Sequence, residues 1–518
     1  MTHARGSSTW SSTRLETSPG RIVRAYRRIR GLGEAAFDAI PAIVAILGIA
    51  LPILLLPVTE EQSAIAPGLY PVALVITCVS AIRLAMLVAH ERPRIVAGTF
   101  WMFLYISAGV VPLAQLHTQS FGHFLVAIDQ MATAALIFLA AAIAFEVGHI
   151  AGRPREGAGV VDKPGRVLTR PRLVGLTVFA TMATAIYVNA LGGPAVFFQS
   201  RAAITQAYLD AGLRSDGNQA AATLILAASV GPALVSLIGW IVVARDRSQR
   251  QPTDFLWLGL AIVLNVMVNN PLVTARYWAL TVLVGIAYAL PGLSRRRFTW
   301  AVVLGVIGAL VIFPYTDVTR YTSVSGAGEV EVVSVAQKIA TKDYDQVVMT
   351  ANGVDYVSDE GFTKGLQTGS AVLFFVPRSM WPGKGEDTGV LLGDHYDLAI
   401  SNLSSPLPLE LWIDYGWVGM GLAFVFFGWG ARRMEDRLDL SGAFGFGRTT
   451  FVALFLPLLA GYGFILMRGP LLQSMSKGIA LLVACWLVTA PARRVDDARA
   501  RSIRLARLRG RRVPEGAP

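Results

Sequence analysis

Long apolar runs constrain this chain more than any other feature of its sequence. A helix needs roughly 20 apolar residues to cross the hydrocarbon core of a bilayer, and runs of about that length recur along the whole chain. The alternating segments of ~10 residues that build membrane β-barrels do not occur in the sequence. Backbone groups in lipid must be paired within the protein, which leaves the helix as the spanning form. We therefore expect an all-α fold, a polytopic bundle of transmembrane helices.

Composition agrees with a membrane protein. The chain is 54% hydrophobic and 15% charged, whereas an ordinary soluble domain is about 25% charged. Its net charge of +12 lies in short basic clusters between apolar runs, which indicates membrane topology and anionic lipid rather than nucleic acid. Cys78 and Cys485 each lie inside an apolar run, so neither a disulfide nor a thiolate metal site is expected. We expect no cofactor.

The apolar runs divide the chain into three parts. Residues 1–35 form a basic cytoplasmic segment, 36–491 the polytopic membrane domain, and 492–518 a basic cytoplasmic tail. The first run lacks a small-residue cleavage site, so it is expected to be a retained span rather than a signal peptide. About 12 spans are predicted, at residues 38–58, 66–88, 97–115, 130–150, 173–192, 220–244, 255–272, 277–293, 299–315, 413–430, 450–467 and 474–491.

Arginine distribution predicts the orientation of these spans. Short connections with an excess of Lys or Arg stay in the cytoplasm, and alternate connections carry that excess, for example 245–250 and 295–297. Both termini are therefore expected in the cytoplasm of a multi-pass protein of the cell inner membrane. The longest connection, 316–411, follows the ninth span and falls outside the cytoplasm. Its aromatic residues and its apolar run favour packing onto the membrane face over disorder.

A few arginines lie on this outer face, against the positive-inside rule. An arginine fork binds phosphate oxygens bidentately, so arginines at the outer bilayer surface suit a diphosphate or carboxylate ligand. Each could instead pair with an outer acidic residue or extend to lipid headgroups. For Arg276 and Arg468 we favour a functional role, because each stands in a very short connection with no acidic neighbour in sequence. The full set is Arg201, Arg214, Arg276, Arg320, Arg378 and Arg468.

The outer stretch 369–417 is dense in aromatic and polar residues, the combination that a sugar face requires. Glu410 and His395 are its candidates for a general base, although Glu410 could equally cap the following span and His395 could be an ordinary loop histidine. Asp394 and Asp397 flank His395, but a solvated acidic loop explains them better than a metal site.

Within this stretch, Pro377-Arg378-Ser379-Met380-Trp381-Pro382-Gly383-Lys384 resembles the Pro-Arg-x-x-Trp-Pro-x-Lys signature in the large outer loop of Wzy-type O-antigen and exopolysaccharide polymerases. The stretch 404–419 resembles the entry of that family into its next span, as Pro-x-Glu followed by Gly-x-x-Gly. Arg276 and Met467-Arg468-Gly469 resemble further arginine positions of the family. Gly385 stands where the family usually has a proline after the signature lysine.

The resemblance implies an oligosaccharide repeat unit polymerase, a glycosyltransferase acting on polyprenyl-diphosphate-linked glycans at the outer face of the membrane. Membrane lipids and other polysaccharide assembly proteins are its implied partners, and nucleic acid is not. The predicted catalytic residues are Arg276, Arg378, Glu410 and His395. The predicted substrate-binding residues are Arg201, Arg320, Trp381, Lys384, Tyr396 and Arg468.

Two other functions fit the same layout. An O-antigen ligase or another polyprenyl-linked glycosyltransferase would share the many spans and the large outer loop. A non-enzymatic glycolipid flippase or transporter would also have about a dozen spans, but it predicts charged residues near mid-membrane and broken helices. The arginines expected at the outer edge of the membrane favour an enzyme over a transporter.

Overall fold

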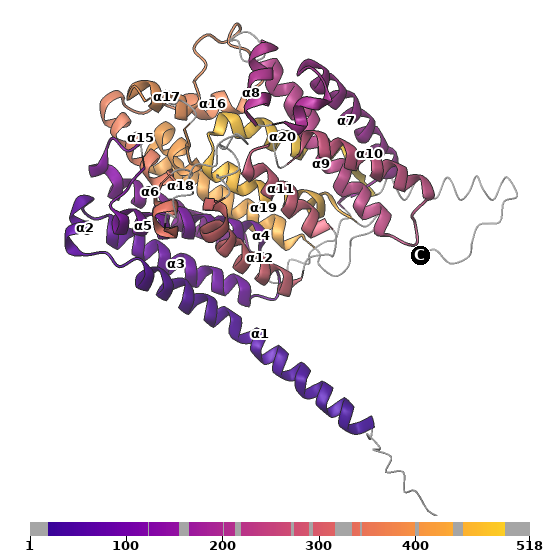
Figure 1. Cartoon of the computed structure of the whole chain (residues 1–518), viewed down its shortest axis with the longest axis horizontal. Coiled ribbons are helices and arrows are strands. Elements are labelled where there is room, and N and C mark those ends of the chain that lie inside the picture. The colour runs from indigo at the N-terminus through magenta and orange to yellow at the C-terminus, as the bar shows by residue number, and fades with distance from the viewer. Residues whose placement is uncertain are drawn as a thin grey trace, which may run out of the picture.

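The computed structural model describes residues 19–122, 124–154, 165–199, 201–212, 219–270, 274–289, 294–315, 334–341, 344–398, 403–438 and 449–492. Within these ranges the chain is helical (Figure 1), apart from short connections and one pair of three-residue strands. The all-α fold is therefore confirmed for this part of the chain.

The first half of the bundle runs from α1 to α10. Its elements are α1 (Pro19–Leu55), α2 (Glu60–Ile65), α3 (Leu69–Ala89), α4 (Ile95–Leu104), the π-helix η1 (Tyr105–Val110), α5 (Val111–Thr118), η2 (Ile128–Gln130), α6 (Met131–Ala151), β1 (Arg166–Leu168), α7 (Arg170–Ala190), η3 (Pro194–Phe198), α8 (Arg201–Asp210), α9 (Gln219–Arg245) and α10 (Pro252–Val268). Figure 1 shows α1 leaving the bundle as a straight rod.

The second half carries the long connection. Its elements are α11 (Arg276–Ala289), α12 (Arg295–Ile307), the π-helix η4 (Gly308–Ile312), η5 (Phe313–Tyr315), α14 (Val335–Ala340), α15 (Gln346–Glu360), α16 (Leu366–Val372), α17 (Thr388–His395), α18 (Leu407–Asp436), α19 (Phe451–Arg468), α20 (Leu471–Val488) and β2 (Thr489–Pro491). β1 and β2 pair antiparallel, with Val167 opposite Ala490.

Every predicted span overlaps a helix. Among the described residues, nine helices are long and apolar enough to cross a membrane. The other three predicted spans correspond to the shorter helices α10, α11 and α12, of 17, 14 and 13 residues. Apolar length and helical form thus support a protein embedded in a membrane, while the count of about 12 spans stays a prediction.

Two apolar cores lie side by side, and α19 belongs to both. One core contains residues of α3, α4, α5, α6 and α18 and of the long connection. The other core contains residues of α7, α9, α10, α11 and α20. Leu456 and Ala460 of α19 lie in the first core, whereas Leu458 and Tyr462 lie in the second. The C-terminal end of α19, where Arg468 stands, is therefore held at the junction of the two cores.

The helices α6 and α18 approach unusually closely through glycines. A β-carbon on Gly428 would lie 2.0 Å from the carbonyl oxygen of Phe145, and one on Gly148 would lie 1.9 Å from that of Val425. Small residues permit such backbone contact between membrane helices. This contact anchors α18, whose first turns carry Glu410.

The long connection folds back onto one end of the bundle. It forms α14 to α17, and α15 is buried along its first nine residues, Gln346 to Val354. α18 begins at Leu407, within the predicted loop, and bends at Gly416, where φ is +60° and favours glycine. The segment 407–415 is thereby set apart from the rest of α18 and stands with α16 and α17.

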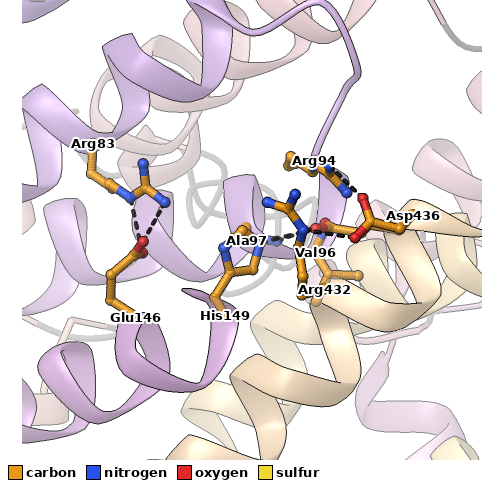
Figure 2. Close-up of polar contacts among 9 residues, drawn as sticks. Arg83, Arg94, Val96, Ala97, Glu146, His149, Arg432 and Asp436 are labelled. Carbon is orange, nitrogen blue, oxygen red and sulfur yellow. Dashed lines mark hydrogen bonds and ion pairs between the residues drawn. The ribbon is translucent and has the colours of Figure 1, made fainter. Parts of the chain in front are cut away.

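A charged cluster joins helix ends at the opposite end of the bundle (Figure 2). Glu435 of α18 accepts hydrogen bonds from the N–H groups of Val96 and Ala97, at 2.9 and 3.1 Å, and lies 3.3 Å from His149 Nε2. Asp436 forms ion pairs with Arg94 and Arg432, at 2.6 and 2.8 Å. The free N–H groups that begin α4 are thus capped by a carboxylate from another span.

Candidate functional site

The signature segment 377–385 is a compact turn closed by its own arginine. The Arg378 guanidinium donates to the carbonyl oxygens of Lys384, at 2.8 Å, and Gly385, at 3.3 Å. The Trp381 N–H donates to the Pro377 carbonyl at 3.2 Å. The side chain of Arg378 keeps 36% exposure and lies 3.8 Å from the Glu386 carboxylate. Part of this guanidinium is therefore open to a ligand while the rest shapes the turn.

Lys384 has a structural task in the same turn. Its ammonium donates to the carbonyls of Leu373, Phe374 and Val376, at 3.1, 2.9 and 2.9 Å, just after the end of α16. The residue is 8% exposed. Burial, and then the neighbouring Arg378, lower the pKa of Lys384. The three ammonium protons all have partners, so the lysine shapes the loop, and its predicted contact with substrate stays a prediction.

Glu410 ties three segments together. Its Oε1 accepts from the N–H of Leu471, the first residue of α20, at 3.1 Å, and its Oε2 accepts from the Thr388 hydroxyl of α17 at 2.8 Å. Glu410 is 2% exposed. The carboxylate caps α20, a different span from the one that carries it, and it is enclosed. The predicted role of Glu410 as a general base stays a prediction, because catalytic hydrogen bonds can form only once the substrate is bound.

Two further carboxylates organise the neighbouring helix ends. Asp414 accepts from the N–H groups of Gln367, at 3.1 Å, and Thr368, at 2.7 Å, at the start of α16. Asp387 precedes α17 and accepts from the N–H of Gly389 at 3.0 Å. Burial raises the pKa of Asp387 to about 6, although the hydrogen bonds that it accepts oppose this rise.

His395 and Tyr396 lie half-buried at the end of α17. His395 Nε2 lies 3.5 Å from Asp359 Oδ2, and its side chain is 22% exposed. The Tyr396 hydroxyl donates to Asp355 Oδ2 at 2.8 Å. Burial and this hydrogen bond raise the pKa of Tyr396. The His395 ring also packs edge-on against Tyr356 and Tyr396, at 5.0 and 4.7 Å between ring centres. His395 is therefore a partly buried candidate for a general base.

Arg468 meets the start of α11 and the long connection. Its guanidinium lies 4.9 Å from the ring centre of Tyr277, the residue that follows Arg276. Asp345 Oδ1 lies 3.9 Å from Arg468 Nη2 and accepts from the Ser404 hydroxyl at 2.6 Å. Asp345 therefore supplies the acidic neighbour that the sequence around Arg468 lacks.

The remaining predicted residues are only partly placed. Arg201 and Arg276 are the first residues of α8 and α11, and their side chains lie outside the described part of the structure. Arg320 and Arg214 also lie outside the described residues. Trp381 is half-buried against α16, where a β-carbon on Gly369 would lie 3.9 Å from its ring.

Sequence reasoning did not select Asp345, Asp359, Asp387 or Lys477. Asp359 and Asp387 lie in the long connection without a recognisable spacing. Lys477 had a usable signal, because it is a lysine within an apolar run. Its Nζ lies 5.6 Å from the ring centre of Trp278, next to Tyr277 in α11. Within the described residues, no group of three or more His, Cys, Asp or Glu side chains could hold a metal ion.

Comparison with protein-family models, with curated proteins and with solved structures gives no match.

The arrangement offers two chemical capacities at one end of the bundle. Arg468 ends α19 beside Tyr277 of α11, and an arginine fork can bind a phosphate ligand. The connection folded over that end carries the partly exposed His395 and a turn with Trp381 and Glu386, residue types that a sugar site uses. The buried carboxylates Glu410, Asp414 and Asp387 hold the connection against the spans.

Proposed function

We propose that this chain is a membrane glycosyltransferase that polymerises polyprenyl-diphosphate-linked oligosaccharide repeat units on the outer face of the cytoplasmic membrane. The observation that supports it best is the folding of the signature 377–384 into a turn whose arginine is partly open. That turn belongs to a connection packed over the helix ends where Arg468 and the start of α11 meet.

The reaction joins two repeat units. An acceptor sugar hydroxyl attacks the anomeric carbon of the donor, a new carbon–oxygen bond forms, and the bond from that carbon to the lipid diphosphate breaks. The hydroxyl proton passes to a base, and the diphosphate leaves with additional negative charge. Fixed cations beside the leaving group stabilise that charge in the transition state. We assign this task to Arg276, Arg378 and Arg468.

His395 is the better of the two candidates for the base. Its side chain is 22% exposed and lies 3.5 Å from the Asp359 carboxylate, whereas Glu410 is 2% exposed and accepts hydrogen bonds from α17 and α20. Glu410 is then a positioning residue. The connection that it holds carries both His395 and Arg378.

Charged pairs at the other end of the bundle bear on the transport alternative. Arg83 pairs with Glu146, and His149 with Glu435 (Figure 2). A transporter would place such groups near the middle of its spans. Glu435 and His149 instead lie in the last turns of α18 and α6. This position favours a structural contact between helix ends over a transport site.

The deciding experiment deletes the gene and sizes the surface polysaccharide. Loss of long chains with retention of single lipid-linked units supports a polymerase. Full-length lipid-linked polymer left unattached supports a ligase, and units trapped on the cytoplasmic face support a flippase. Complementation with Arg276→Ala or Arg378→Ala should abolish chain growth while membrane insertion remains normal. Normal chain lengths in both variants would contradict the site.

A further inference from the structure

The exposed apolar side chains of the long connection gather in one stretch. Among the described residues 344–398, every large apolar side chain that is exposed lies between 362 and 380. Large exposed apolar patches mark surfaces that contact another protein or a membrane. We call this stretch the apolar surface 362–380. Its exposed side chains are Phe362, Leu366, Val372, Leu373, Phe375 and Met380, with exposures from 37% to 77%.

The helix α16 in this surface buries its polar side chains and exposes its apolar ones. Gln367 and Ser370 are buried, at 4% and 0% exposure, whereas Leu366 and Leu373 are exposed. Leu366 and Leu373 are seven positions apart, so they lie on the same side of the helix. The buried Ser370 hydroxyl accepts a hydrogen bond from the Gly385 N–H at 2.8 Å. This inverted pattern is typical of a helix that faces lipid, where polar groups must find their partners inside the protein.

The apolar surface 362–380 continues onto the exposed side of α18. The Phe362 ring packs edge-on against Trp412, at 5.5 Å between ring centres, and Trp412 packs in the same way against Trp417, at 6.3 Å. Trp417 is exposed, and tryptophan is enriched where a bilayer meets water. Phe362 therefore lies beside the edge of the bilayer. The exposed side chains that follow at helical spacing along α18 are Val418, Leu422, Phe426 and Trp429.

The apolar length of α18 shows how far the hydrocarbon reaches. No residue is charged from Trp417 to Ala431, a stretch of 15 residues. As a helix, this stretch is about 22 Å long, whereas the hydrocarbon core of a bilayer is about 30 Å thick. The core therefore extends past Gly416, where a β-carbon would lie 3.3 Å from the Phe362 ring. The beginning of the apolar surface 362–380 is thus at the depth of lipid.

The charges of this surface suit an anionic bilayer. Residues 362–380 include Lys364 and Arg378 and no acidic residue. Lys364 is exposed, and the side chain of Arg378 keeps 36% exposure. Glu386, which lies 3.8 Å from Arg378, follows the surface in sequence. Basic side chains beside inserted apolar groups reach the phosphates of lipid headgroups.

We propose that the apolar surface 362–380 is seated in the adjoining leaflet of the bilayer, with Leu373, Phe375 and Met380 among the acyl chains. Lys364 and Arg378 then lie at the level of the lipid phosphates. The inference goes beyond the proposed function, because it requires only that the chain is embedded in a membrane. It also holds the signature turn 377–384 at the bilayer surface.

The test measures the depth of spin labels on the full chain in vesicles of phosphatidylethanolamine and phosphatidylglycerol. Cys78→Ser and Cys485→Ala remove the native thiols, and Phe375→Cys supplies the labelled site. Label collisions with oxygen, which concentrates among acyl chains, are compared with collisions with a water-soluble nickel chelate. The oxygen-to-nickel ratio at Phe375→Cys should be several-fold higher than at Ser358→Cys, an exposed position of α15, and close to that at Val418→Cys.

Two results would overturn the inference. A ratio at Phe375→Cys equal to that at Ser358→Cys would show that water covers the surface. Low collision rates with both reagents would show that protein covers it. Met380→Cys, at the most exposed side chain of the surface, replaces Phe375→Cys if the melting temperature in detergent shows that the latter is unfolded. Neither result bears on the polymerase proposal, which the length of the surface polysaccharide tests.

Discussion

The Glu410 carboxylate accepts a hydrogen bond from the backbone N–H of Leu471, 61 residues further along the chain, at 3.1 Å. This contact joins the segment before the Gly416 bend to the turn between α19 and α20. The same carboxylate binds Thr388 of α17, so one buried side chain fixes the connection to the membrane helices. Removing this carboxylate should lower the stability of the fold in addition to any effect on catalysis.

Glu410→Ala should lower thermal stability substantially. It leaves the Leu471 N–H and the Thr388 hydroxyl buried without their acceptor, and each such group costs about 1–3 kcal/mol. Glu410→Gln retains an oxygen for one of these donors and should lose less. Melting temperatures of both variants in detergent, beside chain growth in cells, measure this. A stable Glu410→Gln protein that has lost all chain growth would instead identify Glu410 as the base.

Lys384→Met should loosen the signature turn. The change removes the ammonium that three backbone carbonyls share, although the Leu373 carbonyl still accepts from the Val376 N–H. We expect faster limited proteolysis between residues 373 and 385 with the helical bundle intact, measured by mass spectrometry of the fragments. Lys364→Met is the control, because Lys364 is exposed. Equal cleavage rates in the two variants would contradict the structural role of Lys384.

The free energy of unfolding should depend on pH through Asp387. Burial raises its pKa from 3.8 to about 6, so the folded chain binds this proton more tightly than the unfolded chain. The unfolded state therefore loses the proton first, and the contribution of Asp387 to stability should fall as the pH rises from about 4 to about 6. Asp387→Asn should remove this contribution, so that its stability exceeds that of the wild type by up to about 3 kcal/mol at pH 7. Melting temperatures across pH 4 to 7 test this; parallel curves for both proteins would refute it.

Helix positions in this chain were predictable from the sequence, because apolar length is a local property of each segment. The shorter α10, α11 and α12 show the limit of that reasoning. Apolar length locates a helix, but where the helix begins and ends depends on its neighbours, as at Arg295, which pairs with Asp38 of α1.

The contacts of the site could not be predicted in the same way. Asp345 with Arg468, Asp359 with His395 and Glu410 with Leu471 each join residues brought together only by packing. The residue types of the signature were recognisable in the sequence. Which of its cations shapes the turn and which stays partly exposed was not. Arg378 is partly exposed, while the ammonium of Lys384 donates its hydrogen bonds to backbone carbonyl groups.

The glycine contact between α6 and α18 allows a sharp test of the packing that supports the site. Gly428→Ala would place a β-carbon 2.0 Å from the Phe145 carbonyl, so the helices must separate, whereas a β-carbon on Gly430 meets nothing within 4 Å. Overpacking costs typically 1–3 kcal/mol, and contact with rigid backbone should bring this variant to the upper part of that range. Gly430→Ala should be neutral or slightly stabilising, because alanine favours the helix.

Melting temperature and chain growth should fall together in Gly428→Ala, because α18 carries both this contact and Glu410. The Glu435 pairs with α4 and with His149 of α6 depend on the same helix approach (Figure 2). Equal stability of the two alanine variants would show that α6 and α18 do not meet at Gly428. Loss of chain growth in Gly428→Ala with an unchanged melting temperature would mean that the contact shifts the connection without unfolding the bundle.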